Sequence, residues 1–139
     1  MIQIIFGKRG SGKTKRIIDL ANESIKEQKG DVLFIDDDNR YMFDLRHEVR
    51  FINASEYSVF GPERFIGFLN GIMAGNFDVS LVFIDALLHL VKVDKPDIYT
   101  LTPFFEELDN LSTRCNVDFV ISLSEDASLV PDPIRKFAI

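Results

Sequence analysis

The chain has 139 residues, of which 46% are hydrophobic and 27% are charged, and its formal net charge is −6 at pH 7. This length and composition predict a single domain, residues 1–139, with a sizeable core. The excess of acidic residues disfavours non-specific binding to nucleic acid, which is itself negatively charged. The single cysteine, Cys115, excludes an internal disulfide and a zinc site built from several cysteines.

The apolar runs and the N-terminus bear on the compartment of the protein. The first residues lack the charged, apolar and small-residue succession of a signal peptide. Asp85 and His89 interrupt the best candidate for a membrane span. We therefore expect a cytoplasmic protein without a membrane partner, which acts on a protein or a small molecule.

Strand-like and helix-like patterns alternate along the chain, beginning with a β-rich apolar run at residues 2–6. The expected strands are residues 2–6, 32–35, 49–53, 81–85 and 117–122, with a last short strand at 137–139. The expected helices are residues 13–29, a helix between Gly61-Pro62 and Gly75-Asn76, and a helix that begins at Thr102 with its hydroxyl as N-cap. This alternation predicts a three-layer α/β domain with a mostly parallel sheet.

A glycine-rich segment separates the first expected strand from the first expected helix. Its residues are Gly7, Lys8, Arg9, Gly10, Ser11, Gly12, Lys13 and Thr14. The glycines let the backbone wrap phosphate groups with its N–H groups, and the following helix adds the positive end of its dipole. Lys13 is placed to bridge the β- and γ-phosphates, and the Thr14 hydroxyl to coordinate Mg²⁺. The segment therefore predicts a site for a nucleoside triphosphate.

An acidic residue later in the chain, Asp85, supports the same site. Four apolar residues, 81–84, precede Asp85, as expected for a buried parallel strand that ends at the ligand crevice. Asp85 is therefore predicted to hold Mg²⁺ together with Thr14.

These two motifs resemble those of a P-loop NTPase, with Walker A at residues 7–14 and Walker B at residues 81–85. The spacing resembles the RecA-like branch, which implies one strand between the two motif-bearing strands and a polar sensor at the tip of that strand. Ser122, or Ser124 just beyond it, matches this sensor. The chain is also similar to small bacterial P-loop ATP-binding proteins sometimes labelled twitching-motility ATPases, although the further domain and the acidic and histidine motifs of those motors are absent.

One position departs from the RecA-like pattern. The branch commonly has a glutamate directly after the Walker B aspartate to orient the attacking water, and here that residue is Ala86. Some relatives use an acid at the tip of the neighbouring strand, and Asp36, Asp37 and Asp38 follow residues 32–35. Asp36 is the predicted catalytic carboxylate, with Lys13 and Ser122 as the other predicted catalytic residues; a solvated turn of acids is the alternative.

Two basic residues have competing interpretations. Lys8 matches the extra lysine of partition-type ATPases, which reaches the phosphates of an opposite subunit, but Arg9 replaces the glycine that usually follows, so a solvated lysine is the favoured interpretation. His89 lies beside an apolar run without other histidines or cysteines at metal-site spacing. We interpret it as a boundary or core residue.

The sequence predicts an Mg²⁺-dependent ATP-binding protein that is a slow ATPase or a nucleotide-dependent switch. ATP is favoured because the asparagine-lysine-x-aspartate motif of GTPases is absent. Two alternatives stay open: a nucleoside-type kinase, although one cysteine cannot build the zinc-bound lasso of type II thymidine kinases, and an ATP-binding interaction protein without turnover. The protein partner or acceptor, and whether the chain forms a homo-oligomer, stay open as well.

Overall fold

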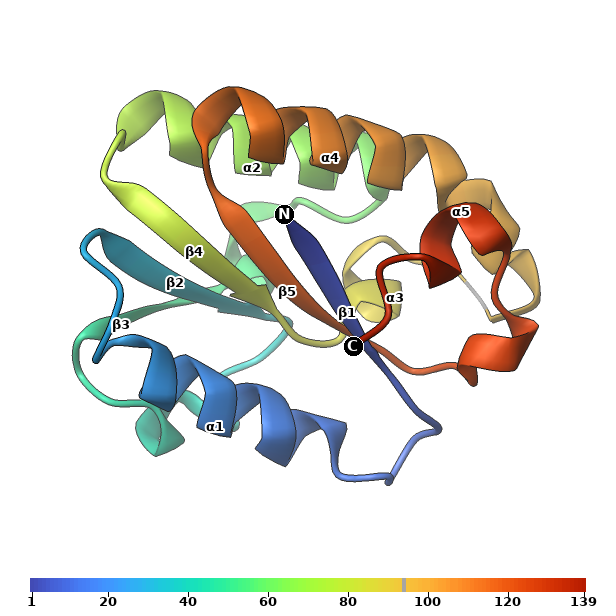
Figure 1. Cartoon of the computed structure of the whole chain (residues 1–139), viewed down its shortest axis with the longest axis horizontal. Helices are drawn as coiled ribbons and strands as arrows, with labels where there is room; N and C mark the ends of the chain where they lie inside the picture. Colours follow the sequence, from blue (N-terminus) through green and yellow to red (C-terminus); the bar gives the residue numbers. More distant parts are fainter. Residues whose placement is uncertain (94) are drawn as a thin grey trace.

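The computed structural model describes residues 1–93 and 95–139, and it places a five-stranded sheet between two helical layers (Figure 1). The strands are β1 Ile2–Phe6, β2 Asp31–Asp36, β3 Val49–Asn53, β4 Val79–Ile84 and β5 Asp118–Leu123. Their order in the sheet is β1-β5-β4-β2-β3, and every neighbouring pair is parallel. The α/β fold with a parallel sheet is thus confirmed.

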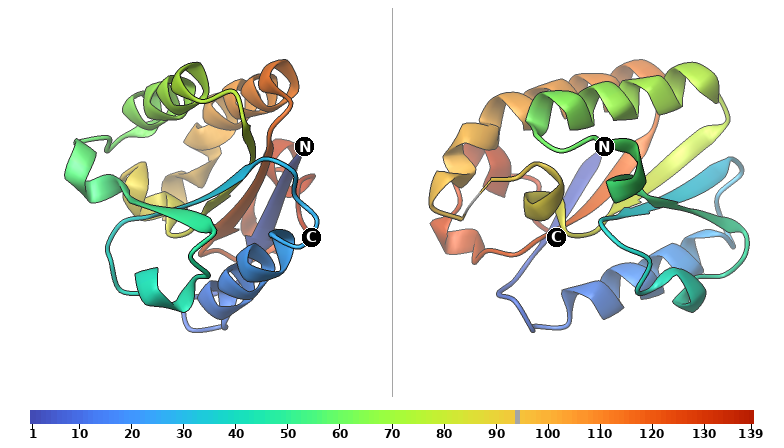
Figure 2. Two further views of the ribbon diagram at one scale, coloured as in Figure 1. Left: turned by 90° about the vertical axis from the view of Figure 1, so that its left-hand side faces the viewer. Right: turned by 180° about the vertical axis from the view of Figure 1, so that it is seen from behind.

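Helices cover both faces of this sheet. The α-helices are α1 Lys13–Ser24, α2 Pro62–Gly75, α3 Leu87–Leu90, α4 Thr102–Cys115 and α5 Asp132–Arg135. Short 3-10 turns span Met42–Asp44, Ala54–Tyr57, Lys95–Leu101 and Ala127–Leu129. Helix α1 packs on one face and α2 with α4 on the other, as the rotated views also show (Figure 2). Among the described residues, no helix is long and apolar enough to cross a membrane.

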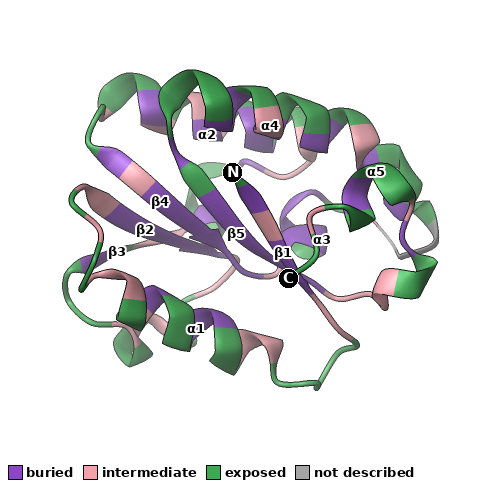
Figure 3. Ribbon diagram, in the orientation of Figure 1, coloured by how far each residue is buried: buried purple, intermediate pink, exposed green. Residues whose placement is uncertain are grey.

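The core lies on both sides of the sheet, so most strand residues are buried (Figure 3). Phe34 and Phe83 belong to the cluster that packs under Ile17 of α1. Ile35 and Ile84, the next residues along the same strands, belong to the cluster under α2 and α4. This alternation fixes the register, because a slip by one residue would exchange the two faces.

The register brings the carboxyl ends of the strands to one edge of the sheet. Phe6 lies opposite Leu123, and Ile84 lies opposite both Ile35 and Ile121. The glycine-rich segment after β1 and the acids after β2 and β4 therefore leave the sheet at the same edge. Strand β5 lies between β1 and β4, as the resemblance to the RecA-like branch implied.

Two helix boundaries differ from the sequence-based prediction. Helix α1 ends at Ser24 rather than at residue 29, and the Ser24 hydroxyl donates to the carbonyl of Ala21 at 2.7 Å. Such a side-chain bond to the backbone favours a helix end. Thr102 is not the N-cap of α4: Leu101 occupies that position, and the Thr102 hydroxyl donates to the carbonyl of Tyr99 at 3.2 Å.

The predicted last strand is reduced to a single bridge beside β1. The Ile4 N–H donates to the carbonyl of Phe137 at 2.8 Å, and the Ile139 N–H donates to the carbonyl of Ile4 at 3.0 Å. Helix α5 ends at Arg135 and its last turn continues to Ala138, whose N–H donates to the Arg135 carbonyl at 3.0 Å.

Candidate functional site

The glycine-rich segment is the turn that leads from β1 into α1. Gly10 and Gly12 have φ angles of +83° and +86°, in the left-handed region that side chains disfavour. Gly12 is also the N-cap of α1. The two glycines therefore let the chain reverse direction, and α1 begins at the cleft described below, which Gly12, Lys13 and Thr14 line. The unpaired N–H groups of a helix start favour an anion.

The Lys13 side chain folds back across this turn. Its Nζ donates to the carbonyl of Lys8 at 2.9 Å, and the Ser11 N–H donates to the same carbonyl at 3.1 Å. At the start of the turn, the Gly7 N–H donates to the carbonyl of Glu125 at 3.0 Å. These contacts hold the ammonium group of Lys13 over the loop, next to the N-terminus of α1.

Asp85, directly after β4, connects three elements. It is 6% exposed, and its Oδ2 accepts a hydrogen bond from the Thr14 hydroxyl at 3.1 Å. Its Oδ1 accepts a hydrogen bond from the hydroxyl of Ser122 in β5, whose Oγ also accepts from the Ala86 N–H at 3.3 Å. The structure thus brings together the two predicted metal ligands, Thr14 and Asp85. A hydroxyl beside a carboxylate offers the hard oxygen ligands that Mg²⁺ prefers.

The two serines proposed as polar sensors lie in different surroundings. Ser122 is 2% exposed and engaged with Asp85, whereas Ser124 lines the open cleft. Ser122 is therefore placed to position Asp85, and Ser124 to contact a molecule in the cleft.

Asp36 ends β2 and is 2% exposed. Its Oδ1 accepts from the Asp37 N–H at 2.7 Å, while its buried Oδ2 has no hydrogen-bond partner in the described part of the chain. Burial raises the pKa of Asp36 to about 8, and the Asp37 carboxyl and the charge of Asp85 act in the same direction. Its predicted role as the catalytic carboxylate stays a prediction.

The next two acids have partners at the rim of the cleft. Asp37 Oδ2 lies 2.9 Å from Nδ1 of His89, and Asp38 Oδ2 lies 3.0 Å from Nη2 of Arg40. One carboxylate oxygen from each of Asp36, Asp37 and Asp38 lies within 4.8 Å of the others.

The interpretation of His89 as a boundary or core residue was wrong: its side chain is 71% exposed. Ala86 has a φ of 59°, so the chain turns sharply after Asp85 into the short helix α3. That helix buries Leu87, Leu88 and Leu90 and leaves His89 facing outward. The sharp turn, rather than the apolar composition of the run, decides where the imidazole points.

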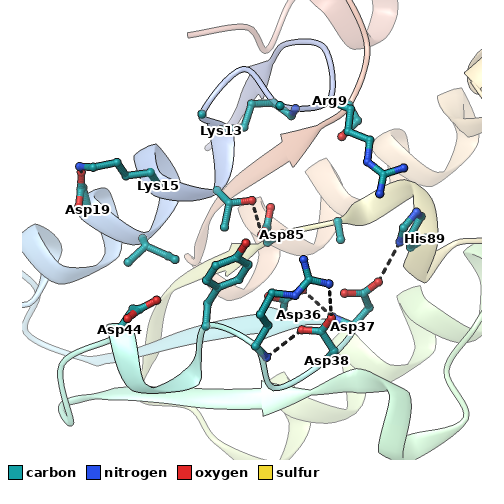
Figure 4. Close-up of a pocket in the computed structure, with 18 of the residues that line it drawn as sticks. Arg9, Lys13, Lys15, Asp19, Asp36, Asp37, Asp38, Asp44, Asp85 and His89 are labelled. Atoms are coloured by element: carbon teal, nitrogen blue, oxygen red, sulfur yellow. Dashed lines mark hydrogen bonds and ion pairs between the residues drawn. The ribbon is translucent and has the colours of Figure 1, made fainter.

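Lys13, Thr14, Asp85, the three acids at the end of β2 and His89 line one cleft of about 730 Å³ (Figure 4). In the view of Figure 4, Asp85 lies between Lys13 and the three acids after β2, and the Asp37 carboxylate points toward His89. The acidic lining residues are Asp19, Asp36, Asp37, Asp38, Asp44 and Asp85, and the cationic ones are Arg9, Lys13, Lys15 and Arg40. The cations of the glycine-rich turn and α1 therefore face a predominantly acidic opposite wall.

Sequence reasoning missed the Asp37–His89 pair and the wall that Tyr41 and Asp44 contribute. The available signal for the pair was the position of His89 four residues after Asp85, as the single polar residue of an apolar run. Little in the sequence indicates that Tyr41 and Asp44 line the cleft, because the hydrophobic residues of 37–48 follow neither the period of a strand nor that of a helix.

We compared the chain with known proteins. No protein-family model matches it, and no curated protein matches it either.

Proposed function

We propose that the chain binds ATP together with Mg²⁺ and hydrolyses it slowly, as a P-loop NTPase of the RecA-like branch. The observation that carries this proposal is the 3.1 Å contact between Thr14 Oγ1 and Asp85 Oδ2 at the N-terminus of α1. Seventy-one residues separate these two side chains in the sequence, and both are oxygen donors of the kind that Mg²⁺ prefers. The glycine-rich turn beside them supports a phosphate site.

Binding would use groups that already face the cleft. The N–H groups at the start of α1 receive the β-phosphate, and Lys13 exchanges its bond to the Lys8 carbonyl for phosphate oxygens. Thr14 and Asp85 hold the metal ion, which neutralises charge on the phosphates, and Ser122 keeps Asp85 oriented.

Slow turnover is the expectation because Ala86 stands where the RecA-like branch commonly has a water-orienting glutamate. A long-lived ATP state also suits a switch that changes the surface offered to a partner protein. The kinase and interaction-protein alternatives share the same nucleotide site, so nucleotide binding is the first property to test.

The test replaces Lys13 by Ala and measures ATP binding by calorimetry in Mg²⁺. Losing a charge-assisted contact worth about 1.5 to 3 kcal/mol lowers affinity roughly tenfold to a hundredfold. Lys26→Ala is the matched control, because Lys26 follows the end of α1, pairs with Glu23 of that helix at 3.2 Å and does not line the cleft. Equal affinity for the wild type and Lys13→Ala contradicts the proposal.

A further inference from the structure

The Asp37–His89 contact joins two segments that are 52 residues apart in the sequence. Asp37 follows β2 and His89 lies on α3, and both line the same cleft as Lys13 and Thr14. The second histidine of the chain offers a contrast: His47 contacts its sequence neighbour Glu48 at 3.1 Å and does not line the cleft. The fold therefore brings only one of the two histidines to the proposed nucleotide site.

The geometry of the pair fixes which imidazole nitrogen is available. An ionised carboxylate can only accept hydrogen bonds, so Nδ1 of a neutral His89 carries the hydrogen that lies between it and Asp37. The second ring nitrogen, Nε2, then keeps its lone pair. Because the His89 side chain is 71% exposed and that of Asp37 is 23% exposed, the carboxylate is partly shielded while the imidazole is open to water.

We propose that water is the phosphoryl acceptor at this site and that His89, oriented by Asp37, is the general base that deprotonates it. This inference rests on the proposed function and adds the acceptor and the proton-accepting group. It accounts for a site in which Ala86 cannot orient water, since His89 lies on helix α3, three residues after Ala86.

The reaction balances without a further reactant. The water oxygen forms a bond to the γ-phosphorus, and the bond between that phosphorus and the β–γ bridging oxygen breaks, which releases ADP. The water proton passes to Nε2 of His89 and then to solvent. Asp37 stabilises the transient imidazolium, as a carboxylate does when it orients a histidine base.

Asp36 is less suited to this step. It is 2% exposed, and one of its oxygens is already used by the Asp37 N–H. The His89 side chain, by contrast, is open to water and lines the same cleft as Lys13 and Thr14.

The experiment measures phosphate release by the purified chain in ATP and Mg²⁺, with nucleotide affinity measured in parallel. Removing a general base typically costs about 10²- to 10⁴-fold, so we expect His89→Gln to lower kcat about 10²-fold or more and to change ATP affinity less than about threefold. His47→Gln is the matched control and should keep the wild-type rate. Free imidazole should partly restore turnover to His89→Ala, which a purely structural role would not allow.

Asp37→Asn provides a second variant. The amide can donate to Nδ1 and so favour the tautomer that lacks a lone pair at Nε2, and we expect a loss of at least about tenfold in kcat. The proposal is overturned if His89→Gln keeps the wild-type kcat, if His47→Gln loses as much, or if the wild type binds ATP without releasing phosphate. A wild type that does not bind ATP overturns the proposed function itself, and the inference with it.

Discussion

Asp85 and Asp36 end neighbouring strands of the sheet and are both nearly inaccessible, yet their partners differ. Both oxygens of Asp85 accept hydrogen bonds from hydroxyl groups, those of Thr14 and Ser122. Asp36 accepts one bond, from the Asp37 N–H, and within residues 1–93 and 95–139 its second oxygen has no partner. Two carboxyl groups at equivalent places of one sheet therefore receive different numbers of hydrogen bonds.

The difference comes from the elements beside each strand. Strand β4 lies next to β5, which supplies Ser122, and the start of α1 supplies Thr14. Strand β2 has β3 as its outer neighbour, and there Asn53 lies opposite Asp36. The side-chain Oδ1 of Asn53 accepts hydrogen bonds from the N–H of Ser55 at 3.1 Å and from its hydroxyl at 2.6 Å. A buried carboxylate thus depends on donors from other elements, and within the described part of the chain β3 supplies none to Asp36.

The largest effect is expected at Asp85, the acid whose two oxygens both have hydroxyl partners. Asp85→Asn should weaken ATP binding about tenfold to a hundredfold in Mg²⁺, because an amide holds the metal ion less well than a carboxylate. In EDTA the two proteins should bind the nucleotide with similar affinity, since the metal-mediated part is absent from both. Calorimetry in the two buffers measures this difference. An equal deficit in both buffers shows that Asp85 does not act through the metal.

A smaller effect is expected on stability when Ser122 loses its hydroxyl. Ser122→Ala leaves Asp85 Oδ1 and the Ala86 N–H without the serine oxygen that now serves both, which should lower the free energy of unfolding by about 1 to 2 kcal/mol. Urea denaturation measures it. Ser124→Ala is the control: that serine lines the open cleft, and its loss should stay within about 0.5 kcal/mol of the wild type. Equal losses in both variants would show that the Asp85 contact is not the cause.

The sequence predicted the parallel α/β fold and the convergence of Thr14 and Asp85, because both follow from local patterns and from the common edge of parallel strands. It did not predict the outward position of His89, which depends on the left-handed backbone of Ala86, a conformation that alanine rarely adopts. The pairing of Asp37 with His89 was missed for the same reason. A single residue between two elements, Ala86, rather than the pattern of β4 or α3, decides where His89 lies.

The last prediction concerns Asp36, the buried acid with one unpartnered oxygen among the described residues. Burial raises the pKa of Asp36 to about 8 in the folded chain, whereas its ordinary value is 3.8. Between these pH values the unfolded chain releases the proton and the folded chain retains it, so this contribution to stability is full below pH 3.8 and is lost as the pH rises through about 8.

Asparagine does not titrate in this range. The free energy of unfolding of Asp36→Asn, relative to that of the wild type, should therefore increase by at least about 1 to 2 kcal/mol between pH 5 and pH 8. Thermal or urea denaturation at the two pH values measures this change. Asp38→Asn is the matched control, because Asp38 is 42% exposed and pairs with Arg40, and its difference from the wild type should vary little with pH. The same pH dependence in both variants would show that the unpartnered oxygen of Asp36 does not cause it. The contrast between Asp36 and Asp85 would then not extend to the free energy of unfolding.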